Sequence, residues 1–150
     1  MAKFRYRMQN ILDIKEKMEN QAKTAYGVAN AKLSTEQQKL QDILIRRAGY
    51  EAKARDLVSG NINIMDIREC RQAIDVLKSK QRSQMMNVHA AERNVELARK
   101  QLNEAMVERK THEKLKEKAF EEFKQELLQA ESKEVDELVS YTYRDNGQQK

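Results

Sequence analysis

Apolar residues recur along most of the chain at alternating spacings of three and four, the heptad pattern of a coiled-coil helix. In the first third, Lys15 interrupts the pattern, and after Ala29 the pattern slips by one residue, a phase shift that a straight stretch of helix can absorb. We therefore expect a first helix over residues 3–58. Its predicted seam consists of Phe4, Met8, Ile11, Met18, Ala22, Ala25, Ala29, Leu33, Leu40, Leu44, Ala54 and Val58.

The clearest interruption of this helical pattern is the tripeptide Ser59-Gly60-Asn61. It predicts that the first helix ends here and that a turn covers residues 59–66. Asp66 is the expected N-cap of the next helix, because its carboxylate can accept a hydrogen bond from a free amide of the first turn.

A second, longer helix is expected over residues 66–143, followed by a flexible tail at 144–150. Its heptad pattern is stricter than that of the first helix, and three of its six seam positions from Val88 to Ala105 are alanine. The predicted seam positions are Ile67, Cys70, Ile74, Leu77, Gln81, Gln84, Val88, Ala91, Val95, Ala98, Leu102 and Ala105, followed by a polar layer of Arg109, His112 and Lys116.

Alanine clusters indicate how the two helices pair. If the chain folds back near Gly60, position i faces roughly position 122 − i, and the alanines of 22–29 lie opposite those of 91–98. Small residues on both sides let two backbones approach closely, which favours intramolecular pairing over a parallel dimer. We predict an all-α fold, a long antiparallel two-helix coiled-coil hairpin that forms one domain over residues 1–150.

The second helix should extend beyond the first, because a first helix starting at residue 3 runs out of partner near residue 119. The apolar stripe nevertheless continues, and an uncovered stripe of this kind is a candidate interaction site. Self-association or fraying of this end is the alternative. The stripe contains Phe120, Phe123, Leu127, Ala130, Val135, Leu138 and Tyr141.

Composition agrees with long helices and a narrow core. The 150 residues include no proline and four glycines, and apolar residues make up 39%, below the roughly 45–50% of globular domains. Full disorder is the competing interpretation, but the regular apolar spacing argues against it.

The net charge of +5 is unevenly distributed. Residues 1–118 contain 25 basic and 16 acidic side chains, and residues 119–150 contain 4 and 8. The basic residues alternate with acidic ones and are not accompanied by a set of stacking aromatics, which argues against a nucleic-acid interface.

Residues that would support catalysis or bind a cofactor are missing from the pattern. There is no glycine-rich phosphate loop and no serine elbow, and His89 and His112 lack further ligands at metal-binding spacing. Cys70, the one cysteine, occupies a seam position, where it serves as a small apolar residue. We therefore expect no enzyme activity, no cofactor and no metal, and a chain in the reducing cytoplasm without a membrane span.

Four large side chains near the turn fall outside the predicted seam, namely Ile43, Tyr50, Ile64 and Met65. They are candidates for partner contacts. Alternatively, they pack on the shifted seam or cover the turn.

The segment from Phe4 to Glu19 resembles the opening of the flagellar export protein FliJ family. That family begins with an aromatic-x-aromatic-x-apolar-Gln pattern, here Phe4, Tyr6, Met8 and Gln9, and continues into a helix rich in lysine and glutamate. The resemblance extends over the whole chain through its length, the glycine-containing turn near residue 60 and the long second helix with an acidic, aromatic end.

This resemblance implies a non-catalytic component of the bacterial flagellar type III export apparatus, and so of motility. Such a protein inserts the end that contains both termini into the hexameric export ATPase and promotes ring assembly. It also contacts the membrane export gate nearer the turn and handles export chaperones. It is expected to be a cytoplasmic monomer that is peripherally associated with the cell membrane at the flagellar base. The implied ATPase-binding residues are Phe4, Tyr6, Met8, Ile11, Phe120, Phe123 and Leu127, and the implied gate-binding residues are Ile43, Tyr50, Ala73 and Leu77.

Two other functions remain open from the residues alone. A generic coiled-coil scaffold or spacer would show the same periodicity. A helical nucleic-acid binder would require binding that falls steeply with salt concentration, and the acidic C-terminal end opposes it.

Overall fold

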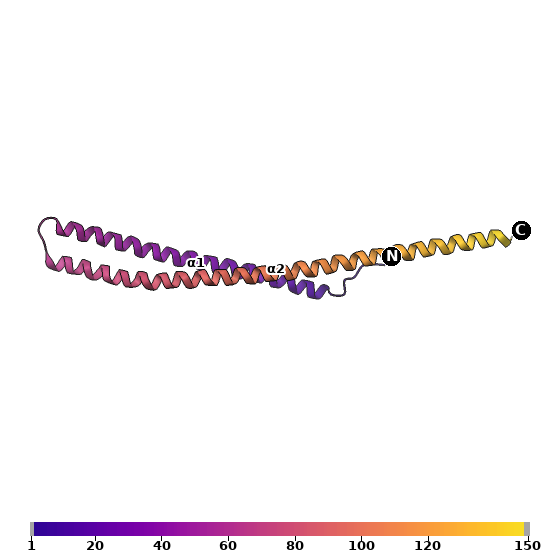
Figure 1. Ribbon diagram of the computed structural model, residues 1–150, viewed down its shortest axis with the longest axis horizontal. Coiled ribbons are helices and arrows are strands. Elements are labelled where there is room, and N and C mark those ends of the chain that lie inside the picture. Colours follow the sequence, from indigo (N-terminus) through magenta and orange to yellow (C-terminus); the bar gives the residue numbers. More distant parts are fainter. Residues whose placement is uncertain (1, 149–150) are drawn as a thin grey trace. The chain divides into compact units, whose positions relative to one another are not determined.

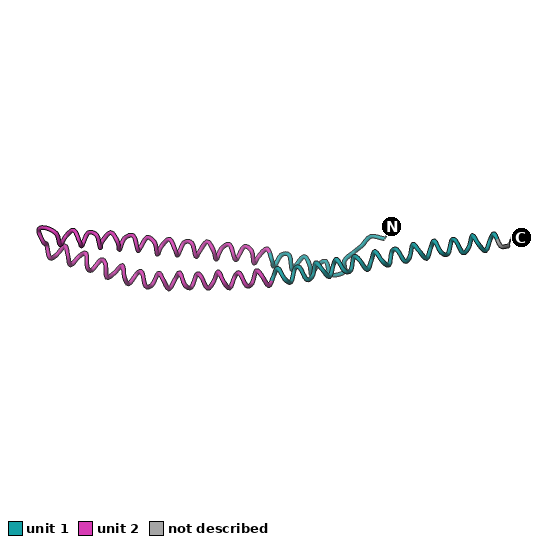
Figure 2. The backbone as a smooth tube through the Cα atoms, turned by 45° about the horizontal axis from the view of Figure 1, so that its top comes forward, with its two compact units in different colours: residues 1–19, 105–150 teal, residues 20–104 magenta. Residues whose placement is uncertain are grey.

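The computed structural model describes residues 2–148 and contains two helices, α1 (Gln9–Val58) and α2 (Ile64–Gln148). The helices pack against each other as a hairpin, and α2 is the longer one, which confirms the predicted fold class (Figure 1). The chain divides into two compact units, residues 1–19 with 105–150 and residues 20–104 (Figure 2). That residues 1–150 act as one domain stays a prediction.

The absence of proline lets both helices continue without a break, over 50 residues in α1 and 85 in α2. Within the described residues, neither helix has an apolar stretch long enough to cross a membrane.

Helix α1 begins at Gln9 rather than at residue 3, so the prediction for residues 3–8 was wrong. This segment contains Lys3, Arg5 and Arg7, and positive side chains in a first turn oppose the positive end of the helix dipole. The first turn that does form contains no acidic residue to compensate.

The turn is shorter than predicted, since α2 already begins at Ile64. Gly60 supplies the reversal, with a φ of 117° that L side chains rarely adopt. The side-chain Oδ1 of Asn63 accepts a hydrogen bond from the Met65 amide at 3.1 Å, so Asn63 and not Asp66 caps the helix. Asp66 lies inside the first turn, where its charge favours the dipole.

At the other end, α2 continues past residue 143 to Gln148. The part of the expected flexible tail at 144–148 is therefore helical. Residues 149–150 lie outside the described part of the chain.

The seam of α1 follows one unbroken heptad phase from Leu12 to Arg47, without the predicted slip after Ala29. Met8, Met18, Ala25, Leu44 and Val58 are exposed, contrary to prediction. The buried or half-buried positions of α1 are Gln9, Ile11, Leu12, Lys15, Glu19, Ala22, Tyr26, Ala29, Leu33, Glu36, Leu40, Ile43, Arg47, Glu51, Ala54 and Leu57.

The seam of α2 agrees with the prediction at every position from Ile67 to Ala105, all of which are buried or half-buried. The polar layer of Arg109, His112 and Lys116 also faces inward and is half-buried. The stricter apolar pattern of α2 made its phase readable, whereas charged residues inside the seam obscured the phase of α1.

Polar bonds across the seam give the register within each unit. In the unit of residues 20–104, Gln84 Nε2 donates to the Glu36 carbonyl at 2.9 Å, and Arg47 Nη1 donates to Gln81 Oε1 at 2.8 Å. In the other unit, Lys15 Nζ pairs with Glu108 at 2.9 Å. The Glu36–Gln84 and Lys15–Glu108 pairs lie within one helical turn of the predicted 122 − i register. The Arg47–Gln81 and Glu19–Arg109 pairs each depart from it by six residues, so the predicted register is only approximate.

Candidate functional site

The first candidate surface lies in the unit of residues 1–19 and 105–150 and starts with a non-helical segment, the N-terminal strap (residues 2–8). Burial alternates along it, as in an extended segment with period two. Phe4 and Tyr6 are half-buried, whereas Lys3, Arg5 and Arg7 are exposed. The strap therefore presents an aromatic face to the protein and a cationic face to solvent.

Phe4 packs against two aromatic rings of α2. Its ring centroid lies 5.1 Å from that of Phe120, at an interplanar angle of 60°, and 5.5 Å from that of Phe123, at 45°. These are favourable tilted geometries for aromatic pairs. Lys124 adds a cation–π contact, with its Nζ 4.7 Å from the centre of the Phe120 ring. All three phenylalanines of the chain thus meet in this aromatic cluster (Phe4, Phe120, Phe123).

Beyond the cluster, α2 continues as the C-terminal overhang (residues 124–146), in which every side chain is exposed. Leu127 is 38% exposed, and Leu138 and Tyr141 are 65% and 72% exposed. The described part of the chain offers these apolar side chains no cover, as the sequence predicted from Leu127 onward. For Phe120 and Phe123 the prediction was wrong, because the strap partly covers them.

The seven residues predicted for the terminal end therefore fall into three places. Phe4, Phe120 and Phe123 are brought together, and Tyr6 lies in the same strap. Met8 is exposed at the end of the strap. Ile11 is half-buried in α1 beside the seam position Leu12, and Leu127 lies in the overhang.

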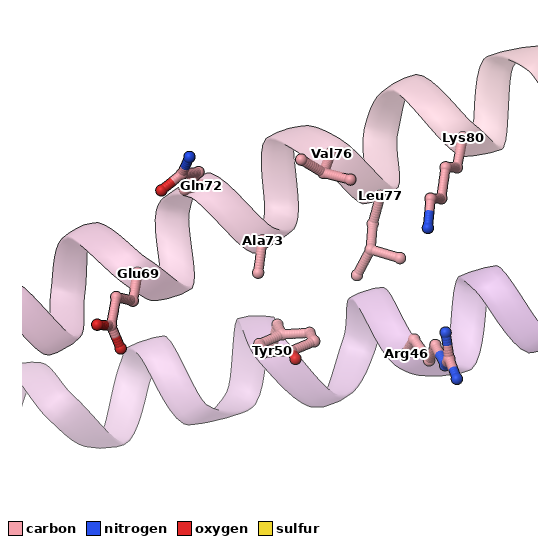
Figure 3. Close-up of a pocket in the computed structure, with 8 residues that line it drawn as sticks. All are labelled: Arg46, Tyr50, Glu69, Gln72, Ala73, Val76, Leu77 and Lys80. Carbon is pink, nitrogen blue, oxygen red and sulfur yellow. The ribbon is translucent and has the colours of Figure 1, made fainter.

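The second candidate surface is an open groove of about 650 Å³ between the helices in the unit of residues 20–104. Figure 3 shows Tyr50 from α1 lying beneath Ala73 of α2, with Leu77 pointing toward α1. The small side chain of Ala73 leaves the space that the groove occupies. The lining residues are Arg46, Tyr50, Glu69, Gln72, Ala73, Val76, Leu77 and Lys80.

Three of the four residues predicted for the gate-facing surface, Tyr50, Ala73 and Leu77, line this groove. Ile43 does not. It is a half-buried seam residue that lines a neighbouring groove with Ile45.

Sequence reasoning missed the polar part of the groove. Figure 3 shows Arg46 and Lys80 at one end and Glu69 at the other. Within described residues 2–148, neither Arg46 nor Lys80 forms an ion pair, so both charges are available to a partner. The signal was present as positions 69, 72, 73, 76 and 80, which follow one face of a helix beside the seam.

Charged pairs between the helices have structural roles. The hydrogen bond and charge of Lys15 lower the pKa of Glu108 below its usual range. Arg109 pairs with Glu113 of its own helix at 2.7 Å and, between the helices, with the buried Glu19 of α1, and both contacts raise the pKa of the Arg109 guanidinium. Pairs of this kind fix register rather than perform chemistry.

Among the described residues, no group of three histidine, cysteine or acidic side chains is arranged to hold a metal ion. Both candidate surfaces are open and shallow, which suits contact with another macromolecule better than enclosure of a small molecule.

Comparison with known proteins adds a family and a fold. The model of the family described as flagellar FliJ protein matches residues 4–148. A search of curated proteins finds no match. The solved structure of a putative YscO homolog, CT670 from Chlamydia trachomatis, is similar in fold, with a TM-score of 0.76 and 22% sequence identity over 99% of this chain and 100% of that one. Since the family model matches nearly the whole sequence, this chain belongs to the flagellar FliJ protein family.

Proposed function

We propose that this protein is a stalk that binds the hexameric flagellar export ATPase through its terminal end and promotes assembly of the ATPase ring. Membership of the FliJ family makes the chain a non-catalytic component of the flagellar type III export apparatus. The proposal adds a specific partner and assigns it to one surface. That surface consists of Phe4, Tyr6, Met8, Ile11, Phe120, Phe123 and Leu127.

The C-terminal overhang is the observation that carries this proposal. Its leucine, valine and tyrosine side chains are exposed along a helix that packs against no other segment among described residues 2–148. An exposed apolar face of this kind marks a surface for another protein. The overhang lies next to the aromatic cluster, so one partner can engage both.

Loss of the exposed apolar side chains tests the proposal. We expect the wild-type chain to raise the hydrolysis rate and ring formation of the purified cognate export ATPase. Leu127→Ala combined with Leu138→Ala should weaken binding by roughly tenfold or more, since central apolar anchors contribute most of the binding energy. Leu97→Ala, at an exposed position of the other unit, is the matched control. Equal binding by both variants would refute the assignment.

We further propose that the groove around Tyr50 binds the cytoplasmic region of the membrane export gate, with Ile43 at its margin. The support is an apolar floor flanked by Arg46, Lys80 and Glu69, which favours a partner surface of matching charge. Tyr50→Ala should reduce binding to the isolated gate region, whereas Tyr26→Ala, a seam position outside the groove, should reduce it only through lost stability. A gate that binds Tyr50→Ala as tightly as wild type would exclude this surface.

We also propose that the chain is a monomer, that it lies in the cytoplasm at the flagellar base, and that it contacts export chaperones. A generic scaffold is the second candidate, and it predicts no stimulation of the ATPase. A nucleic-acid binder predicts binding that falls steeply with salt.

A further inference from the structure

We propose that the N-terminal strap is a latch that covers Phe120 and Phe123 in the free protein and is displaced when a partner binds the C-terminal overhang. The inference rests on the proposed function in that the export ATPase serves as the partner. It goes further by assigning an autoinhibitory contact between the two ends of the chain.

The strap is attached to α2 by side chains alone. Its backbone hydrogen bonds, from the Gln9 amide to the Tyr6 carbonyl at 3.2 Å and from Ile11 and Leu12 to the Met8 carbonyl, all belong to the start of α1. Among the described residues, no backbone bond joins the strap to α2. Phe4 and Tyr6 are only half-buried, so the contact opens with little disturbance elsewhere.

Charge keeps the strap separable. Lys3, Arg5 and Arg7 point away from the aromatic face, and none of them forms an ion pair within residues 2–148. The same three cations disfavour extension of α1 through residues 3–8. The strap is therefore neither incorporated into the coil nor held by salt bridges.

The covered residues begin the row that a partner would follow. Phe123 and Leu127 are four residues apart, and Phe120 precedes Phe123 by three, so all three share one helix face. Phe120 remains 38% exposed even with Phe4 packed on it. A partner that binds Leu127 and extends along this helix face toward the N-terminus of α2 contacts the rings of Phe123 and Phe120. Phe4 covers part of both rings, so full contact requires that the strap moves away.

The three phenylalanines allow a direct test, because fluorine-labelled phenylalanine reports on this cluster and nothing else in the chain. In the free protein, Phe4→Leu should shift the fluorine signals of Phe120 and Phe123. When the purified export ATPase is added, we expect the Phe4 signal to leave its packed position, while the signals of Phe120 and Phe123 change because the partner now covers these two rings. A Phe4 signal that stays at its packed position in the complex would overturn the latch.

A reversible lock provides the second test. In a Cys70→Ala background, Lys3→Cys and Lys124→Cys are joined by a short, reducible thiol cross-linker, since Lys124 lies against the Phe120 ring. Locking should weaken ATPase binding by roughly tenfold or more, and reduction of the linker should restore it. Each single-cysteine variant treated in the same way is the control.

The outcomes separate the two proposals. Unchanged binding after locking refutes the latch but leaves the ATPase proposal intact. Absence of binding by the unlocked double variant and by the wild type alike refutes the ATPase proposal, and with it the partner on which the latch depends.

Discussion

At the scale of single residues, the seam is unusual for the charged and amide side chains inside it. Glu19 is 5% exposed and Gln84 is 8% exposed, and both have partners on the opposite helix. Polar residues in a coiled-coil core lower stability but select one register. In a hairpin with alanine-rich layers, where many apolar registers are nearly equivalent, such residues decide which one forms.

Substitutions in the layer formed by Glu36 and Gln84 test whether polar core residues lower the stability of this hairpin. Gln84 donates to both the carbonyl and the carboxylate of Glu36. Glu36→Leu with Gln84→Leu should raise the free energy of unfolding by about 1–3 kcal/mol, because a packed apolar layer replaces desolvated polar groups. Gln84→Leu alone should lower it by about 1–2 kcal/mol, since it removes a partner of a half-buried acid.

Urea unfolding followed by circular dichroism measures both changes. Gln38→Leu, which removes only an exposed bond to Asp42 within α1, is the matched control and should stay within about 0.5 kcal/mol of wild type. A double variant less stable than Gln84→Leu alone would contradict the interpretation.

The Lys15–Glu108 pair predicts a dependence on pH. The pKa of Glu108 is lowered in the folded protein, so its contribution is complete above the ordinary carboxylate value of 4.5 and is lost as pH falls through the lowered value. Glu108→Gln should reduce the melting temperature slightly at neutral pH and have a smaller effect at about pH 3. Glu104→Gln, an exposed position on the same helix, is the control, and an equal effect of Glu108→Gln at both pH values would contradict the prediction.

At the scale of elements, the helix ends depend on local chemistry. Asn63→Ala should destabilise the protein by about 0.5–2 kcal/mol, because it removes the hydrogen bond to the Met65 amide. Asp66→Ala should cost less, since this residue contributes only its charge near the positive helix end. Chemical denaturation of the two variants compares these costs directly, and the reverse order would show that Asp66 is the functional cap.

The overhang differs from the rest of α2 because it contributes helix without packing. A chain ending after Lys124 should lose helical signal yet unfold within about 0.5 kcal/mol of the full chain, because every side chain in 124–146 is exposed. Thermal melting by circular dichroism tests this. A large loss of stability would show that the overhang supports the hairpin.

At the scale of the whole molecule, the fold depends on α1 pairing with α2 of the same chain. Ala29 and Ala91 line one shallow groove from opposite helices. In a Cys70→Ser background, Ala29→Cys and Ala91→Cys should therefore cross-link within a single chain, and sedimentation equilibrium should give a monomer at all concentrations. Ala31→Cys with Ala91→Cys is the control, because Ala31 is exposed on α1. Cross-linked dimers would contradict intramolecular pairing.

The sequence by itself determined the helical class, the reversal at Gly60 and the seam of α2. Each of these follows from local propensity or from the spacing of apolar residues, which one chain displays directly. The exposed row from Leu127 onward was also predictable, because it only required counting how far α1 could reach.

Only the tertiary structure decided the rest. Glu19, Glu36 and Arg47 belong to the seam because residues of α2 form hydrogen bonds or ion pairs with them. The spacing of apolar residues along the sequence does not reveal such polar partners. The groove around Tyr50 could not be predicted from the sequence either, because it is lined by residues of both helices. Phe4 has helical spacing to Met8 and Ile11, yet its ring packs on Phe120 from a non-helical strap, because contacts between distant segments outweigh a weak local preference in a cationic segment.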